Sequence, residues 1–338
     1  MADVARLAGV SAKTVSNVLN GYPYIRAETR ARVEQAISTL GYELDEAARS
    51  LRSGRSGQVA LVVPELAQPY FAQLADAVLA AGRRHGVRVV IEATGFNRAN
   101  ELDALRAPRR RMIDGLLFSP VALEQSEAHL LDVGAPLVLL GEQIFSDDVD
   151  HVTMNNVEGA RAATELLLGV GRRRIVVLGA PHEHARGTSM LRFEGYRQAL
   201  AARGLAVDPA LAPSTDSGWH RTDGARAVGA VLDSGQQVDG VVAFNDALAL
   251  GALHELQVRG LRVPEDVAVV GFDDTEDARF SQPALTTVDA GRAEIARVAV
   301  DLLCERIAGG GPPRPVLHRA AMRLVERAST PPRPDHAS

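Results

Sequence analysis

The stretch ADVARLAGVSAKTVSNVLNG, residues 2–21, predicts two short helices joined by a tight turn. Apolar residues recur at helical spacing in its first half, at Val4, Ala5, Leu7 and Ala8. Gly9 interrupts this pattern and supplies the positive φ that such a turn needs. Ser11 stands where the N-cap of a second helix, over residues 11–19, belongs. The stretch therefore predicts a helix-turn-helix.

The second helix has a side suited to the DNA major groove. Its inward residues are Val15, Val18 and Leu19. On the outward side, next to Ala12, Lys13 can donate to guanine and Asn17 can form a paired contact with adenine. The hydroxyl groups that we expect on phosphates are those of Ser11, Thr14 and Ser16. The alternative is a surface helical hairpin that binds no partner. The position of Lys13 favours DNA binding, because this only lysine of the chain lies on the outward side.

The overall composition fits a small domain attached to a larger body. A chain of 338 residues has room for a small domain and a two-lobed core. Residues 1–57 contain eight Lys and Arg and six Asp and Glu, which gives them a net charge of +2. Because the whole chain has a net charge of −5, the remaining residues together carry −7. Cys304 is the only cysteine, and no signal segment or membrane span is visible, so we expect a cytoplasmic protein.

A third helix and a short hinge follow the helix-turn-helix. The third helix is predicted over residues 27–40 and ends at Gly41, which completes a head over residues 1–44. Asp45 caps a run of under two turns, residues 46–51, which cannot be stable alone in water. With Leu51 at its end and Arg52 beside it, this run suggests a minor-groove wedge with phosphate contacts. An ordinary linker over residues 45–57 is the alternative.

From residue 58 onward, strand-length apolar runs alternate with helical stretches. The runs are 59–63, 87–91, 115–118, 137–140, 174–178, 240–243 and 267–271. Such alternation is typical of doubly wound parallel sheets. A polar break near residues 151–156 divides the runs into two groups. We therefore expect two similar lobes with a cleft between them.

Ligands of open parallel sheets bind beyond the carboxyl ends of the strands. The residues that follow the predicted strands, with the polar segment around the only tryptophan, are Gln68, Pro69, Tyr70, Phe71, Asn97, Ser119, Glu142, Gln143, Arg186, Thr188, Trp219, Asn245, Asp246, Asp273 and Asp274. Their carboxylates, amides, guanidinium and aromatic rings suit a polyhydroxylated or heterocyclic ligand. Asn245 and Asp246 have an alternative role as caps of a helix over residues 247–259.

Several separated stretches together resemble one known family. They are DVARLAGVSAKTVSNVLNG, ETRARVEQAISTLGY, AARSLRSGRSG, VALVVPELAQPYFAQL, RRRIVVLG, RFEGYRQAL, FNDALALGALHELQVRGLRVPEDVAVVGFDD and PALTTV. In this order they resemble the lactose-repressor/galactose-repressor family of bacterial transcription regulators over nearly the whole chain. The resemblance implies a small all-α helix-turn-helix head and an α/β periplasmic-binding-protein-like core of two doubly wound parallel-sheet lobes.

The resemblance also implies roles for particular residues. The positions that match base-reading residues are Ala12, Lys13 and Asn17, and Leu51 matches the hinge residue that enters the minor groove. The positions that match the effector pocket are Phe71, Arg186, Thr188, Trp219, Asn245 and Asp273. With Tyr70 and Asp246 these form our expected effector site.

The chain departs from the family pattern at several places. The first helix lacks the usual Thr-containing N-cap, and Arg26 replaces a small hydroxyl residue at the start of the third helix. Leu44 and Asp45 replace the usual Pro-Asn before the hinge. Glu142 and Gln143 replace a common Asp-Arg pair, so the floor of the pocket is expected to differ. The Pro-rich tail contains no apolar heptad, so we expect no tetramer-forming coiled coil.

These observations define the expected organisation. The head spans residues 1–44, the hinge 45–57, the core 58–328 and a disordered tail 329–338. Lobe 1 combines residues 58–154 and 290–315, and lobe 2 combines 155–289 and 316–328. We expect a homodimer that binds near-palindromic operator DNA. Its two heads would lie in two major grooves, and its paired hinges would lie in the central minor groove. An effector in the cleft, a sugar or sugar derivative, would control operator affinity allosterically, with a purine or nucleoside as the second choice.

Two other classes of protein compete with this interpretation. A solute-binding protein for transport would share the core, but it would carry a signal peptide and no DNA-binding head. An enzyme would need acid and base groups, for which Asp246 and Asp273 are candidates, or a metal held by His182 and His184. No nucleophile elbow, zinc spacing or glycine-rich phosphate loop accompanies these residues. We therefore expect no catalytic residues, no metal and no cofactor.

Overall fold

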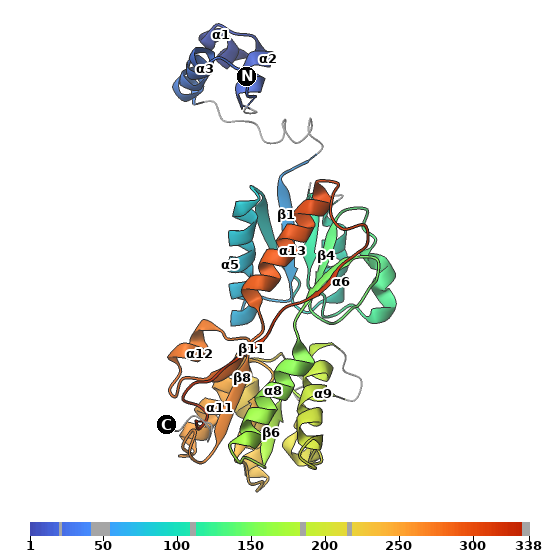
Figure 1. The fold of residues 1–338 in the computed structure, drawn as a ribbon, viewed down its shortest axis with the longest axis vertical. Helices are drawn as coiled ribbons and strands as arrows, with labels where there is room; N and C mark the ends of the chain where they lie inside the picture. The colour runs from blue at the N-terminus through green and yellow to red at the C-terminus, as the bar shows by residue number, and fades with distance from the viewer. Residues whose placement is uncertain (20–21, 42–54, 109–112, 183–186, 215–217, 333–338) are drawn as a thin grey trace. The chain divides into compact units, whose positions relative to one another are not determined.

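The computed structural model describes residues 1–19, 22–41, 55–108, 113–182, 187–214 and 218–332. The chain forms two compact units, Met1–Ser56 and Gly57–Ser338, which we describe one at a time (Figure 1). Within these described ranges, no helix is long and apolar enough to cross a membrane. The predicted hinge residues 45–54, Leu51 and Arg52 among them, lie outside the described ranges.

The first unit contains the predicted helix-turn-helix. Its helices are α1 (Ala2–Ala8), α2 (Ala12–Leu19) and α3 (Ala27–Leu40). Val4, Val15 and Val33 come from different helices and are fully buried against one another. Gly9 adopts the predicted left-handed conformation, with φ at 63°. Leu7 is 53% exposed, contrary to our expectation, because the neighbouring helices cover the other face of this short helix.

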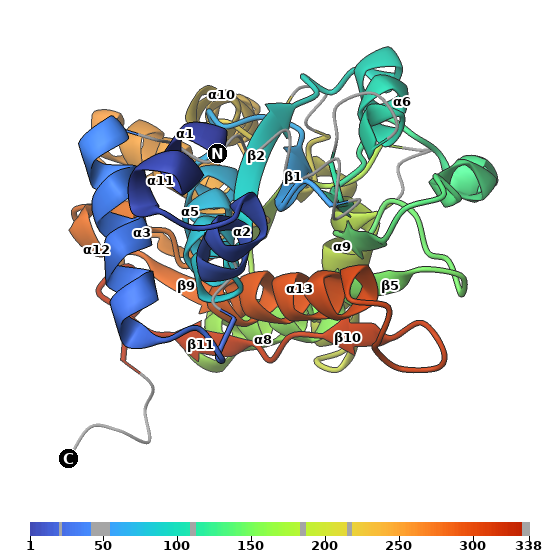
Figure 2. The same ribbon diagram turned by 90° about the horizontal axis from the view of Figure 1, so that it is seen from above.

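The first sheet of the second unit has the strand order β10-β5-β4-β3-β1-β2, and its neighbouring strands run parallel. Its strands are β1 (Gln58–Val63), β2 (Arg88–Ala93), β3 (Gly115–Phe118), β4 (Leu137–Leu140), β5 (Asp150–Thr153) and β10 (Leu317–Arg319). The helices are α5 (Pro69–Arg84) and α13 (Arg292–Ile307) on one face, with α6 (Arg98–Leu105) and η1 (Gln125–Leu131) on the other. Figure 2 shows α13 and α6 on opposite sides of β1. Because both faces are covered, Leu61 and Val62 of β1 are equally buried although they point in opposite directions.

The second sheet has the order β11-β9-β8-β7-β6, with β11 antiparallel to β9. Its strands are β6 (Ile175–Leu178), β7 (Gly240–Ala243), β8 (Ala268–Phe272), β9 (Thr286–Asp289) and β11 (Arg323–Val325). The helices are α8 (Asn156–Gly169) and α9 (Thr188–Ala201) on one face, with α10 (Arg221–Asp233) and α11 (Asp246–Val258) on the other. The short elements are η2 (Pro209–Leu211) and α12 (Glu276–Phe280). Each sheet with its helices forms one lobe, as predicted.

The predicted polar break at residues 151–156 was partly wrong, because it contains β5. All seven predicted strands are present, and each end lies within two residues of the predicted end. The sequence did not predict β5, β9, β10 and β11. The polar side chains of β5 are buried because each has a partner: Asp150 pairs with Arg306 at 2.7 Å, and the His151 ring lies 2.5 Å from the Gly141 carbonyl. A strand whose polar side chains are buried by pairing with partners has no apolar pattern, so the sequence pattern does not predict it.

The predicted lobe boundary and the predicted tail also need correction. Residues 317–319 form β10 and pair with β5, so they belong to lobe 1 rather than to lobe 2. The chain then crosses to lobe 2, where β11 pairs with β9. Ser329 and Thr330, expected in the disordered tail, are buried. The Ser329 hydroxyl donates to the Val269 carbonyl at 2.6 Å and accepts the Thr286 amide at 2.8 Å, which fastens this segment to the second sheet.

Candidate functional site

The outward side of α2 has the exposure that the sequence predicts. Ala12 and Lys13 are exposed, and Asn17 is partly exposed. The Ser11 hydroxyl accepts a hydrogen bond from the Thr14 amide at 3.1 Å, so Ser11 caps α2 as predicted. Thr14 and Ser16 are partly exposed. No side chain caps α1 or α3, where the sequence departs from the family pattern at Met1 and Arg26.

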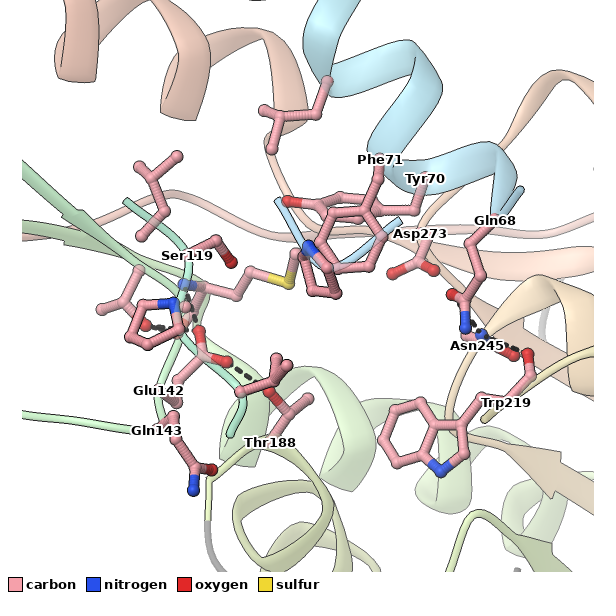
Figure 3. Close-up of a pocket in the computed structure, with 18 of the residues that line it drawn as sticks. Gln68, Tyr70, Phe71, Ser119, Glu142, Gln143, Thr188, Trp219, Asn245 and Asp273 are labelled. Carbon is pink, nitrogen blue, oxygen red and sulfur yellow. Dashed lines mark hydrogen bonds between the residues drawn. The ribbon is translucent and has the colours of Figure 1, made fainter. Parts of the chain in front are cut away.

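A cavity of about 270 Å³ lies between the two lobes (Figure 3). It is lined by the carboxyl ends of strands from both sheets and by the first turns of α5 and α9. The predicted effector residues that line it are Tyr70, Phe71, Thr188, Trp219, Asn245 and Asp273. Arg186 lies outside the described residues. Tertiary folding therefore brings together residues that are up to about 200 positions apart in the sequence.

Asp246 does not line the cavity, so its prediction as an effector contact was wrong. Its side chain is fully buried at the start of α11. There its carboxylate accepts hydrogen bonds from the Thr275 amide at 2.7 Å and from the Thr287 hydroxyl. Burial raises the pKa of Asp246, and these donors oppose the rise. Asp246 holds the start of α11 against the loop that carries Asp273.

Asn245 caps α11, one of the two roles that the sequence left open, and it also lines the cavity. Its Oδ1 accepts the Leu248 amide at 2.8 Å, so Asn245 is the N-cap of α11. Its Nδ2 donates to the Trp219 carbonyl at 2.9 Å and to Gln68 Oε1 at 3.2 Å (Figure 3). Gln68 belongs to lobe 1 and Asn245 to lobe 2. The side chain of Asn245 therefore links the lobes as well as lining the cavity.

A buried charged pair lies at the back of the cavity. The Arg192 guanidinium donates to Asn156 Oδ1 at 2.7 Å, lies 3.6 Å from the centre of the Phe272 ring, and is 3.7 Å from the Asp273 carboxylate. Burial lowers the pKa of Arg192 and raises that of Asp273, while the attraction between them opposes both shifts. Asp273 has a φ of 114°, and Arg292 fixes this strained backbone by donating to the Asp273 carbonyl at 3.0 Å.

Glu142 forms a second link between the lobes. Its carboxylate accepts hydrogen bonds from the Thr153 hydroxyl and the Met154 amide in lobe 1, and from the Thr188 hydroxyl in lobe 2. A third link joins Glu65, on the same loop as Gln68, to the His220 ring at 3.2 Å. Polar contacts thus bridge the cleft on both sides of the cavity.

Sequence reasoning found part of this site in advance. Gln68 and Glu142 follow strands and are recognisable as candidates, although they were left out of the expected effector site. Arg192 lies in the second turn of α9 and follows no strand, so the strand-end rule offers no signal for it. No group of three or more His, Cys, Asp and Glu side chains in the described ranges could hold a metal ion.

Comparison with known proteins agrees with both units. The family described as "Bacterial regulatory proteins, lacI family" matches residues 1–44, and a "Periplasmic binding protein-like domain" matches residues 164–330. The HTH-type transcriptional regulator CelR of Thermobifida fusca is 35% identical over 90% of this chain and 91% of its own length.

Two similar solved structures span nearly the whole chain. A CelR-cellobiose complex is 32% identical with a TM-score of 0.73, and the lac repressor dimer bound to operator and the anti-inducer ONPF is 27% identical with a TM-score of 0.83. Each covers 97% of this chain and 98% of the similar one.

A helix-turn-helix head joined to a two-lobed core with a cavity between the lobes defines a ligand-controlled DNA-binding regulator. The chain belongs to the lacI family of bacterial regulatory proteins. It is an HTH-type transcriptional regulator of the allosteric type that this family represents.

Proposed function

We propose that this regulator binds a near-palindromic operator as a homodimer and represses transcription, without any enzymatic activity. The observation that carries the proposal is the exposed reading side of α2, with Lys13 and Asn17 on it, in a chain that also holds a ligand-sized cavity. Each head is only weakly basic, so two heads on a two-fold site double a small attraction to phosphates. Such a protein works in the cytoplasm, where its DNA is.

We infer that Leu51 and Arg52 act at the centre of the operator. Leu51 would enter the minor groove, with phosphate contacts from Arg52, while Ser11, Thr14 and Ser16 contact phosphates from the head. The hinge sequence is too short to hold a helix alone, so DNA is the partner that would order it.

We further infer that the effector is a sugar or sugar derivative held between the lobes. Support comes from the mixture of buried carboxylate, amide and aromatic groups around the cavity, and from the relative whose solved complex contains cellobiose. Binding would shift the equilibrium between arrangements of the lobes and thereby change operator affinity.

The proposal is tested by measuring operator affinity at fixed salt on DNA that flanks the gene of this protein. We expect a clear preference over random DNA and a change in affinity when an effector is added. Lys13→Ala should relax base preference at one position per half-site, and Leu51→Ala should weaken operator binding. Equal binding to all DNA, with and without candidate sugars, would refute the proposed function.

A further inference from the structure

We propose that lobe 1 carries a second DNA-binding surface, which contacts phosphates of the duplex beside the part that the hinge binds. The surface lies at the edge of the first sheet where its strands begin, and it consists of Arg83, Arg84 and Arg106. We call it the basic edge. The proposal goes beyond the head and the hinge, and it rests on the proposed function because it requires that the hinge binds DNA.

Backbone hydrogen bonds place the end of α5 beside the residue with which the second unit begins. That residue is Gly57, whose carbonyl accepts the Arg88 amide at 2.9 Å where β1 and β2 start. The carbonyl of Gly82, in the last turn of α5, accepts the Val87 amide at 3.1 Å. The two arginines that end α5 therefore lie where the chain enters from the hinge, at the end of the lobe where β1 begins (Figure 1).

The opposite face of the sheet contributes Arg106 to the same edge. Because α6 connects the parallel strands β2 and β3, it must run back from the end of β2 toward the start of β3. Arg106 is the C-cap of α6 and so lies at that end. The Gly57 amide donates to Asp114 Oδ2 at 2.8 Å, which brings the start of β3 to the entry of the chain as well.

The three side chains of the basic edge are free to bind a partner. Arg83, Arg84 and Arg106 are exposed, and their guanidinium groups have no hydrogen bond or ion pair with the described residues. Most other arginines in the described part of this unit are paired, as Arg306 is with Asp150 at 2.7 Å. A paired arginine must lose its partner before it binds a phosphate, whereas a free arginine can form a bidentate phosphate contact without that loss.

The carboxylates near the basic edge are already engaged. Asp301 pairs with the His85 ring at 2.7 Å, and Asp114 accepts the Gly57 amide. Asp103 of α6 also has an interaction partner. These groups therefore do not neutralise the three arginines.

The charge of this sheet edge is also distributed unevenly. Asp132 and Asp148 precede β4 and β5, which lie beyond β3 in the strand order, away from β1 and β2. Residues 109–112, outside the described ranges, add three arginines and no carboxylate to the sequence before β3. Positive charge therefore gathers on the side where the chain enters, which suits a polyanion such as DNA.

Chain length keeps the hinge close to the basic edge, whatever the arrangement of the two units. Six residues lead from Leu51 to Gly57, and six residues span at most about 20 Å. Duplex DNA carries one phosphate charge per about 1.7 Å of its axis, so roughly a dozen phosphates lie within such a span. Since residues 1–57 have a net charge of only +2, three further arginines per protomer would more than double the positive charge that attracts DNA.

The test measures operator affinity of the full-length protein over a range of salt concentrations. The variant is the triple substitution Arg83→Gln, Arg84→Gln and Arg106→Gln. We expect its affinity to be at least tenfold lower at about 0.1 M salt, and the slope of log affinity against log salt to be shallower by about 2 or more. The preference for the operator over operators with one changed base pair should stay at the wild-type value, because phosphate contacts carry no sequence information.

Arg203→Gln is the matched control for the removal of charge. Arg203 is also exposed and has no partner among the described residues, but it follows α9 in lobe 2. Its replacement should leave affinity and slope unchanged, since salt screens charges over about 10 Å. Wild-type affinity and slope in the triple variant would refute the proposal. A loss in Arg203→Gln that matches the triple variant charge for charge would refute it too, because net charge alone would then explain the effect.

Phosphate ethylation interference identifies the contacts directly. We expect ethylation of phosphates beside the operator centre to weaken binding of the wild type and of Arg203→Gln, but not of the triple variant. The same interference pattern in all three proteins would overturn this inference alone. A wild-type protein without operator preference would instead overturn the proposed function.

Discussion

Replacing Gln68 with methionine should loosen the contact between the lobes without unfolding either of them. Gln68 Oε1 accepts a hydrogen bond from Asn245 Nδ2 at 3.2 Å across the cleft, and both side chains are buried. Methionine has a similar length, so Gln68→Met removes the acceptor and retains most of the packing. The change therefore leaves one N–H of Asn245 without its partner.

The magnitude follows from the cost of a buried donor without an acceptor. That cost is about 1–3 kcal/mol, which corresponds to roughly a 5- to 150-fold shift in an equilibrium. Because Asn245 lines a cavity that admits water, the lower end of this range applies here. Each lobe has its own buried core, so the lobes separate at lower cost than either unfolds. We expect about a fivefold shift toward separated lobes.

Trp219 provides the assay. It is the only tryptophan of the chain, it lines the cavity, and its carbonyl accepts the other N–H of Asn245 at 2.9 Å. Separation of the lobes should expose its ring, so acrylamide should quench the fluorescence of Gln68→Met more efficiently than that of the wild type. The melting temperature should change little.

Gln143→Met is the matched control for this experiment. Gln143 is also a glutamine of lobe 1 that lines the cavity, but it makes no hydrogen bond to another described residue. Its replacement should leave the quenching at the wild-type value. Equal quenching of Gln68→Met, Gln143→Met and the wild type would show that the bond between Gln68 and Asn245 does not hold the lobes together.

Three further predictions concern the helices and the pH dependence. A Cβ on Gly251 would lie 1.9 Å from the Arg221 carbonyl oxygen, so Gly251→Ala should lower the free energy of unfolding of the core by about 1–3 kcal/mol, measured by denaturant unfolding. A change below about 0.5 kcal/mol would contradict the close packing of α10 on α11. Ser11→Ala removes the acceptor of the Thr14 amide and should cost the head about 1 kcal/mol, measured by amide hydrogen exchange in α2; unchanged exchange would refute the cap. Burial raises the pKa of Asp273 to about 8, and sugar hydroxyls favour its ionised form, so sugar affinity should rise from pH 6 through pH 8 and level off only above this pKa; a flat calorimetric profile for the wild type would contradict this.

The sequence by itself determined the local features of this protein. Gly9 and Ser11 specify the turn and the cap of the head because their conformation and hydrogen bonding depend on residues within a few positions. Six of the seven predicted strands are covered on both faces, and this burial requires a continuous apolar run that the sequence shows. The seventh, β2, is apolar in sequence although it lies at the sheet edge and is only partly buried. The carboxyl ends of these strands then located part of the cavity lining, including Asn245 and Asp273.

Only the tertiary structure decided which polar groups are buried and what they bind. Asp150 and His151 can be buried in a strand because distant residues satisfy their polar groups: Arg306 of α13 pairs with Asp150, and the carbonyl of Gly141, directly after β4, lies against the His151 ring. The same dependence on distant partners turns Asp246 away from the cavity, and it brings Arg192 of α9 to Asp273. Apolar burial follows a periodic pattern that can be recognised in the sequence, whereas burial of a charge depends on partners that only the folded chain brings into contact.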